Sequence, residues 1–85
     1  MKHFLVLALR KPGFSPEVVQ PHLDFIEGLR SQDRLALTGG FADGTGGAYL
    51  LKNVDSLAQA REIVALDPLV LRDASELTVH EWNTR

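Results

Sequence analysis

The hydrophobic pattern near the start of the chain predicts a strand that is buried on both faces. Residues 3–10 are almost wholly apolar. Successive side chains of a strand point to opposite faces, so the alternate residues from Phe4 to Ala8 share one face and those from Leu5 to Leu9 share the other. Apolar residues on both faces are typical of a strand with a packed layer on each side.

A helix is predicted next, between residues 15 and 33. Ser15, Pro16 and Glu17 supply an N-cap hydroxyl, a proline for the first turn and an acidic residue near the helix N-terminus. Apolar residues then recur at helical spacing, at Val19, Leu23, Ile26 and Leu29. Pro21 falls inside this run, so the helix either kinks there or begins there after a short opening turn.

The middle of the chain is typical of a β-hairpin. Residues 35–38 form a second strand that runs into Gly39 and Gly40, residues 42–47 are a glycine-rich turn, and residues 48–52 form a third strand. The glycine-rich segment lies between two strands and lacks the phosphate-loop pattern that precedes a helix. We interpret it as a hairpin turn that forms the rim of a pocket.

The remainder predicts a second helix and a last strand. Residues 53–56 restart a helix with Asp55 as its cap, and an apolar stripe continues to Leu66 before Asp67 and Pro68 end it. Residues 69–74 are a connector with room for one helical turn. Residues 76–82 are a strand, with Leu77 and Val79 on one face and Thr78, His80 and Trp82 on the other.

The resulting order, β-α-β-β-α-β, predicts one ferredoxin-like α+β domain over residues 1–85. Right-handed crossovers place both helices on one face of a four-stranded antiparallel sheet. The open face would then expose either the Leu5 to Leu9 side of the first strand or the alternating neighbours of these residues, together with residues such as Tyr49 and Leu51. An apolar patch of this kind rarely stays in water, so we predict a homodimer that packs through the open face.

Composition and charge narrow the classes of partner. The net charge is −2 and there is no basic cluster, which argues against a nucleic-acid-binding surface. The apolar run at the N-terminus is far too short to span a membrane. Cysteine is absent, which excludes disulfides and thiolate metal sites and fits a cytoplasmic location. No spacing of residues suggests a metal or cofactor site.

The topology gathers three separated pieces of sequence at one end of the domain: His22 early in the first helix, the loop at residues 39–47, and Asp67. His22 and Asp67 would form an acid/base pair in which His22 transfers a proton and Asp67 orients its ring. Two structural alternatives stay open. His22 could instead bond a backbone carbonyl, and Asp67 could cap a short turn that begins at Pro68. Asp43 fits the side-chain chemistry of a turn.

The chain resembles the YCII-related family of small dimeric ferredoxin-like proteins. The resemblance covers nearly the whole chain and is carried by the N-terminal strand and by four further segments, residues 21–23, 34–40, 48–51 and 65–68. It implies a histidine/aspartate-centred active site, and family members include a dehydrochlorinase of chlorinated hydroxyquinol breakdown. His22 and Asp67 are the matching residues, with Asp43 as the fallback aspartate. Gly40 departs from the family pattern, where proline is usual, and Leu69 stands where an aromatic residue is common.

These observations lead to one main functional hypothesis. The chain is predicted to be a small-molecule enzyme with lyase- or dehydrochlorinase-like general acid/base chemistry on a small, aromatic metabolite. His22 and Asp67 would be catalytic, and Gly39, Gly40 and Asp43 would line the substrate pocket, with no cofactor and no metal. The alternative is a non-catalytic, dimeric ligand-binding or accessory module.

Overall fold

Eight elements follow one another in the computed structural model, which describes residues 1–85. In chain order they are β1 (Lys2–Arg10), the 3₁₀ turn η1 (Pro16–Val18), α1 (Val19–Ser31), β2 (Leu35–Gly40), β3 (Gly46–Leu51), α2 (Leu57–Val64), α3 (Pro68–Leu71) and β4 (Ser75–Asn83). This order confirms the predicted ferredoxin-like α+β fold. The helical turn expected between residues 69 and 74 is present as α3.

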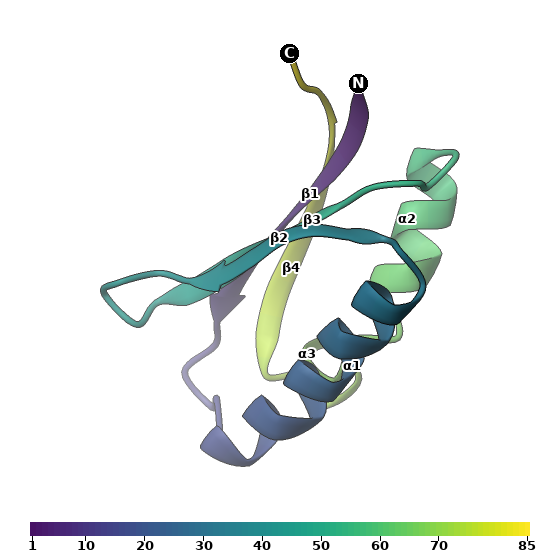
Figure 1. Ribbon diagram of the computed structural model, residues 1–85. Coiled ribbons are helices and arrows are strands. Elements are labelled where there is room, and N and C mark those ends of the chain that lie inside the picture. Colours follow the sequence, from purple (N-terminus) through teal and green to yellow (C-terminus); the bar gives the residue numbers. More distant parts are fainter.

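The strands form one antiparallel sheet in the order β2-β3-β1-β4. Both longer helices, α1 and α2, lie on the same side of this sheet and leave its other face uncovered (Figure 1). The β2–β3 hairpin extends away from the body, and the two chain termini lie together at the far end of β1 and β4 (Figure 1). The backbone N–H of Thr84 donates to the carbonyl of Met1 at 2.8 Å and ties the termini to each other.

The core lies between the helices and the sheet. Phe4 and Val6 of β1 are fully buried there, whereas Leu9 on the other face is 52% exposed. The main cluster contains residues of the sheet, of α1 and α2, and of the connection before α2, namely Phe4, Val6, Ile26, Leu29, Leu35, Tyr49, Leu51, Val54, Ala60 and Val64. A second, smaller cluster joins the end of β1 to α3 and consists of Ala8, Val18, Leu69 and Ala74.

The predicted composition of the open face was wrong for two residues. Tyr49 pairs with Val6 and Leu51 pairs with Phe4, and directly opposed residues share a face of the sheet. Both side chains therefore point toward the helices and are buried. Because the side-chain period of a strand is two, a one-residue error in register moves a residue to the opposite face. Leu50, the intervening residue, lies on the open face instead.

The two helix starts also resolve questions that the sequence left open. The first helical segment opens with η1, and α1 begins at Val19, so Pro21 lies in the first turn of α1, where a missing N–H costs little. The predicted Asp55 cap was wrong. Ser56 caps α2, its hydroxyl accepting the Gln59 N–H at 3.1 Å. The Gln59 side chain in turn accepts the backbone N–H of Asp55, the residue before the cap, at 2.7 Å.

The hairpin strands reach further into the glycine-rich segment than predicted. β2 extends through Gly40 and β3 begins at Gly46, so only residues 41–45 form the turn. Glycine is required where the two strands approach most closely. A Cβ on Gly47 would lie 2.4 Å from the carbonyl oxygen of Gly39, too close for any side chain.

None of the helices is long and apolar enough to cross a membrane.

Candidate active site

His22 and Asp67, which are far apart in the sequence, are in direct contact. His22 lies in the first turn of α1, one and two turns before the buried Ile26 and Leu29 on the same helix face. Its side chain is 18% exposed. The ring nitrogen Nδ1 lies 2.9 Å from Oδ1 and 3.1 Å from Oδ2 of Asp67. The structure thus forms the predicted histidine/aspartate pair, and its catalytic role stays a prediction.

Asp67 is fully buried between α2 and α3. Besides His22 it has two further partners. The backbone N–H of Leu69 donates to Oδ1 at 2.9 Å, which makes Asp67 the N-cap of α3, and the hydroxyl of Tyr49 donates to Oδ2 at 2.9 Å. The capping role that sequence reasoning treated as an alternative to the histidine contact is present together with it, because Oδ1 has two lone pairs and lies within hydrogen-bond distance of both the Leu69 N–H and His22 Nδ1.

Tyr49 is the member of this network that sequence reasoning missed. It stands on β3, opposite Val6, and its ring is tilted against His22 with centroids 6.0 Å apart. Burial, and then the negative charge of Asp67 and the hydrogen bond to it, raise the pKa of Tyr49 far above its usual range. Tyr49 therefore stays a protonated donor. The signal that could have found it was the register of β3 against β1, which places Tyr49 on the helix side.

The arrangement determines which nitrogen of His22 is free to react. Asp67 accepts hydrogen bonds from the Leu69 N–H and the Tyr49 hydroxyl, and both of its oxygens lie toward Nδ1 of His22. We therefore assign the Nδ1–H tautomer to neutral His22, with the lone pair on Nε2. Nε2 makes no hydrogen bond within the chain, and His22 lines a cavity. A histidine held in this way can accept a proton at Nε2, and Asp67 stabilises the resulting imidazolium.

The cavity beside His22 has a volume of about 280 Å³. Besides His22 and Tyr49 it is lined by Ala8, Arg10, Phe14, Val19, Leu23, Thr38, Gly39, Gly40, Gly46, Gly47, Ala48, Leu69 and Ser75. Gly39 and Gly40 are part of this lining, and their role in a substrate pocket stays a prediction. Sequence reasoning missed Arg10, Phe14 and Ser75, because they reach the cavity from strand ends and a connecting loop that carry no motif. It also missed Thr38, which shares the helix side of the sheet with Tyr49 through the register of β2 and β3.

Asp43 is not brought to this cavity. It lies in the hairpin turn, where its carboxylate accepts hydrogen bonds from the hydroxyl and the backbone N–H of Thr45, at 2.7 and 3.0 Å. These bonds lower the pKa of Asp43. Its position corresponds to the turn chemistry weighed from the sequence and does not support pairing with His22. No group of three or more histidine, aspartate or glutamate side chains could hold a metal ion.

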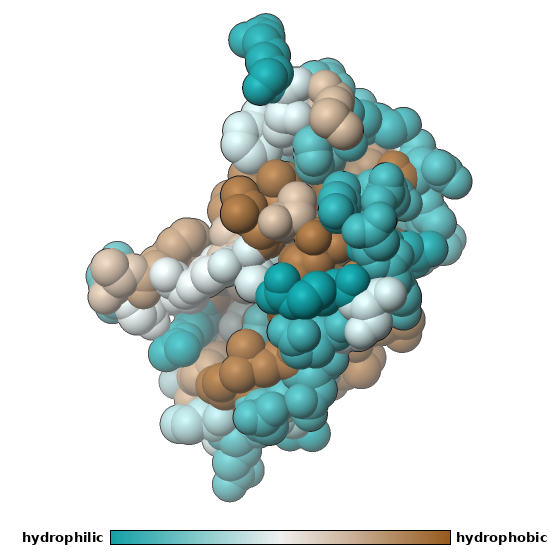
Figure 2. Space-filling view, viewed as in Figure 1, coloured by the Kyte–Doolittle hydropathy of each residue, from teal (hydrophilic) through white to brown (hydrophobic).

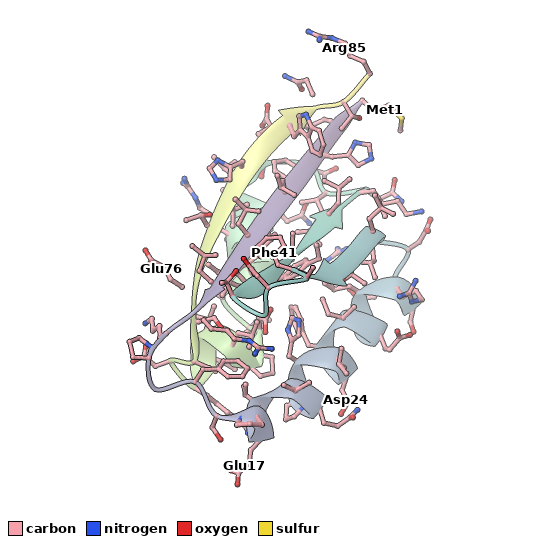
Figure 3. The ribbon with its side chains drawn as sticks, turned by 90° about the vertical axis from the view of Figure 1, so that its left-hand side faces the viewer. Met1, Glu17, Asp24, Phe41, Glu76 and Arg85 are labelled. Carbon is pink, nitrogen blue, oxygen red and sulfur yellow. The ribbon has the colours of Figure 1, made fainter.

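The hairpin stands beside the cavity as an arm. Figure 2 shows this arm projecting from the body of the molecule, with apolar side chains at its base. Phe41 lies at the tip that faces the viewer in Figure 3, whereas Glu17 and Asp24 on the outer side of η1 and α1 point away from the sheet. The acidic side chains of this helical segment therefore do not face the cavity, and its lining contains no carboxylate.

Comparisons with known proteins agree with this fold. The family model described as the YCII-related domain matches residues 3–83. The uncharacterized protein YjpA of Bacillus subtilis (strain 168) is 42% identical over 85 residues, which are 100% of this chain and 99% of that protein. Two solved structures under 25% identity show likeness of fold. One is the 5-chloro-2-hydroxyhydroquinone dehydrochlorinase TftG of Burkholderia phenoliruptrix AC1100, in complex with 2,5-dihydroxybenzoquinone. Its TM-score is 0.74 at 20% identity, and the match covers 95% of this chain and 93% of the TftG chain. The other is the protein At3g17210 of Arabidopsis thaliana, with a TM-score of 0.61 at 14% identity over 100% of this chain and 96% of that one.

Proposed function

The chain belongs to the YCII-related domain family, and from that premise we propose that it is an acid/base enzyme in which His22 transfers a proton to or from a small hydroxylated ring compound. The observation that carries the proposal is the contact between Nδ1 of His22 and the fully buried Asp67, next to a cavity that His22 lines. A buried carboxylate that orients a histidine is the arrangement that general acid/base chemistry needs.

The proposed reaction begins with the free Nε2 of His22. It accepts a proton from an acidic O–H or C–H of the ligand, and the electron pair left on the ligand forms a new double bond as a leaving group departs. In a dehydrochlorinase-like reaction the leaving group is chloride, and the proton passes from His22 to water. Asp67 stabilises the imidazolium between these steps, and Tyr49 holds Asp67 in position from the opposite side.

The proposed substrate class has two supports. The cavity is small, about 280 Å³, and is lined by apolar side chains and glycines with few polar groups, which suits a single ring with hydroxyl substituents. The structural neighbour TftG is a dehydrochlorinase in complex with 2,5-dihydroxybenzoquinone. At 20% identity this is a likeness of fold alone. We therefore propose the class of compound and not the substrate of TftG itself.

We also propose that the chain works as a homodimer that packs through the open face of the sheet. A groove on that face is lined by Leu5, Leu37, Phe41, Leu50 and Trp82, and Leu37 is 70% exposed in the single chain. An isologous contact between two such faces would remove this apolar surface from water. The groove shares Thr38, Gly39, Gly40, Ala48 and Tyr49 with the cavity, so a second copy would lie close to the site.

A turnover screen tests the enzyme against the alternative of a binding module. Wild type, His22→Gln and the control Asp24→Asn, altered at an exposed residue on the outer side of the same helix (Figure 3), are incubated with hydroxylated and chlorinated quinols and quinones. We expect turnover of at least one compound by wild type and Asp24→Asn, and a loss of about a hundredfold or more in His22→Gln. Equal rates in wild type and His22→Gln would remove His22 from the mechanism. Compounds that bind the wild type without turnover would favour the binding module.

A further inference from the structure

Arg10 is a charged side chain in the cavity lining that the proposed proton transfer does not use. It is the last residue of β1, where alternation places it on the helix side of the sheet with Phe4, Val6 and Ala8. Its main chain is fixed, because its N–H donates to the carbonyl of Thr45 at 2.9 Å. The guanidinium therefore projects from a rigid strand end toward the cavity that His22 also lines.

The guanidinium is held by an aromatic ring and not by a carboxylate. The guanidinium carbon of Arg10 lies 4.2 Å from the centroid of the Phe14 ring, a cation–π contact. Phe14 is itself packed against the small core cluster that contains Val18 and Leu69. This contact fixes the position of the cation, but it uses the face of the guanidinium and leaves its N–H donors free.

None of these donors has a partner within the chain. Arg10 takes part in no ion pair and no side-chain hydrogen bond. Asp73, a carboxylate in the connection between α3 and β4, is instead paired with Lys11. Arg10 is also the only permanently charged residue of the cavity lining, which contains no aspartate or glutamate. Arg10 is an exposed residue at the edge of this cavity. An anchored cation with free donors, at the edge of a cavity without acids, is an arrangement that can recognise an anion.

We infer that Arg10, anchored on Phe14, binds a deprotonated oxygen of the ligand, so that the cavity selects single-ring compounds that carry a phenolate or a carboxylate. This inference rests on the proposed function in taking the cavity as the substrate site, and it adds the charge of the substrate. The anionic oxygen would bind at Arg10 while the reacting O–H or C–H faces Nε2 of His22. Arg10 thus acts as a specificity residue and His22 as the acid/base.

The test compares anionic and neutral ligands of the same shape. Binding of benzoate, benzamide, and a dihydroxybenzoquinone is measured by titration at low salt for wild type, Arg10→Gln and Lys11→Gln. Lys11→Gln is the matched control, because it removes the neighbouring positive charge, which is paired with Asp73 and does not line the cavity. A Phe14→Leu variant keeps the charge of Arg10 and removes its anchor.

We expect wild type to bind an anionic probe more tightly than benzamide. Arg10→Gln should weaken binding of the anionic probe by about tenfold or more and leave binding of benzamide unchanged. Lys11→Gln should change the affinity for the anionic probe by less than about twofold, because an exposed paired charge contributes little, and Phe14→Leu should weaken that affinity by an intermediate factor. Whether benzoate or the quinone responds more distinguishes a carboxylate from a phenolate ligand.

Three outcomes would overturn the inference: no binding of either anionic probe by wild type, equal binding of anionic and neutral probes, or equal weakening of both by Arg10→Gln. A fourth variant separates this inference from the proposed function. In His22→Gln the charge preference should persist although turnover is lost. If the preference is present but wild type turns over none of the ligands, the anion site stands and the acid/base proposal fails.

Discussion

At the scale of single residues, the candidate site depends on one carboxylate that accepts hydrogen bonds from three elements. His22 comes from α1, Tyr49 from β3 and the N–H of Leu69 from α3. A buried carboxylate is costly unless donors surround it, and no buried side-chain polar atom of the chain is left without a partner. The same bonds that make the burial of Asp67 tolerable also fix the ring of His22, so stability and orientation have a common origin.

Tyr49 provides a residue-level prediction that needs no substrate, because it is the only tyrosine of the chain. Its pKa is raised in the folded state, so folded protein keeps a proton that the unfolded chain releases near pH 10. The stabilisation is fully present below that pH and is lost as pH rises above it. In an ultraviolet titration, tyrosinate should appear near pH 10 when the chain is unfolded in denaturant. In native buffer it should appear only at the pH at which the protein unfolds. A reversible native titration near pH 10, with the fold intact, would contradict the Tyr49–Asp67 bond.

At the scale of elements, Asp67 caps α3 and also bonds the side chains of His22 and Tyr49, and two variants separate these roles. Asp67→Ser keeps an oxygen that can cap α3 but loses the bonds to His22 and Tyr49. Asp67→Ala loses the cap as well as these side-chain bonds. We expect both variants to be destabilised by about 1–3 kcal/mol, since a buried donor is left unsatisfied. Asp67→Ala should be the less stable of the two by about 1 kcal/mol, the usual contribution of a cap. Chemical denaturation measures both differences. Equal free energies of unfolding would show that the cap contributes nothing.

Sequence patterns predicted the elements well and the details of their ends and faces less well. The alternation in β1 and the helical spacing around Ile26 depend on local periodicity, and both elements are present. The identity of the α2 cap depended on which of two adjacent cap-forming residues, Asp55 or Ser56, accepts the Gln59 N–H. The face of Tyr49 depended on the register between β1 and β3, which is set by long-range pairing and not by the local pattern.

The same distinction applies to the candidate site. Topology alone placed His22, the glycine-rich hairpin and Asp67 at one end of the domain, and they meet there. Arg10 and Phe14 could not be predicted, because their contact forms across a connection that has no motif. Asp43 was a candidate on resemblance, and its own short-range bonds to Thr45 hold it in the turn.

At the scale of the whole molecule, the open sheet face leads to a prediction about assembly. An 85-residue chain buries only about 60–65% of its unfolded surface by itself, so covering the groove around Leu37 would add to its stability. Light scattering at micromolar concentration should return twice the 9.4 kDa mass of one chain. Leu37→Asp should shift the protein toward the monomer, because it places a charge in an apolar contact.

Leu71→Asp is the matched control, since Leu71 is 67% exposed but lies on α3, away from the open face. It should leave the mass of the wild type unchanged. A stable monomer in the wild type would refute the dimer, and an equal response of both variants would place the contact elsewhere. The cytoplasmic location expected from the absence of cysteine stays a prediction.

The central claim, that His22 moves a proton of a bound ligand, is tested most directly by hydrogen–deuterium exchange of that ligand. A quinol or quinone that binds the cavity is incubated in D₂O with wild type or His22→Gln, and the loss of its proton signal is followed by NMR. We predict that wild type catalyses exchange or elimination, and that His22→Gln is slower by about a hundredfold or more while it still binds the ligand. Equal rates with the two proteins, or a bound ligand whose protons wild type does not exchange, would contradict the assignment of His22 as the acid/base.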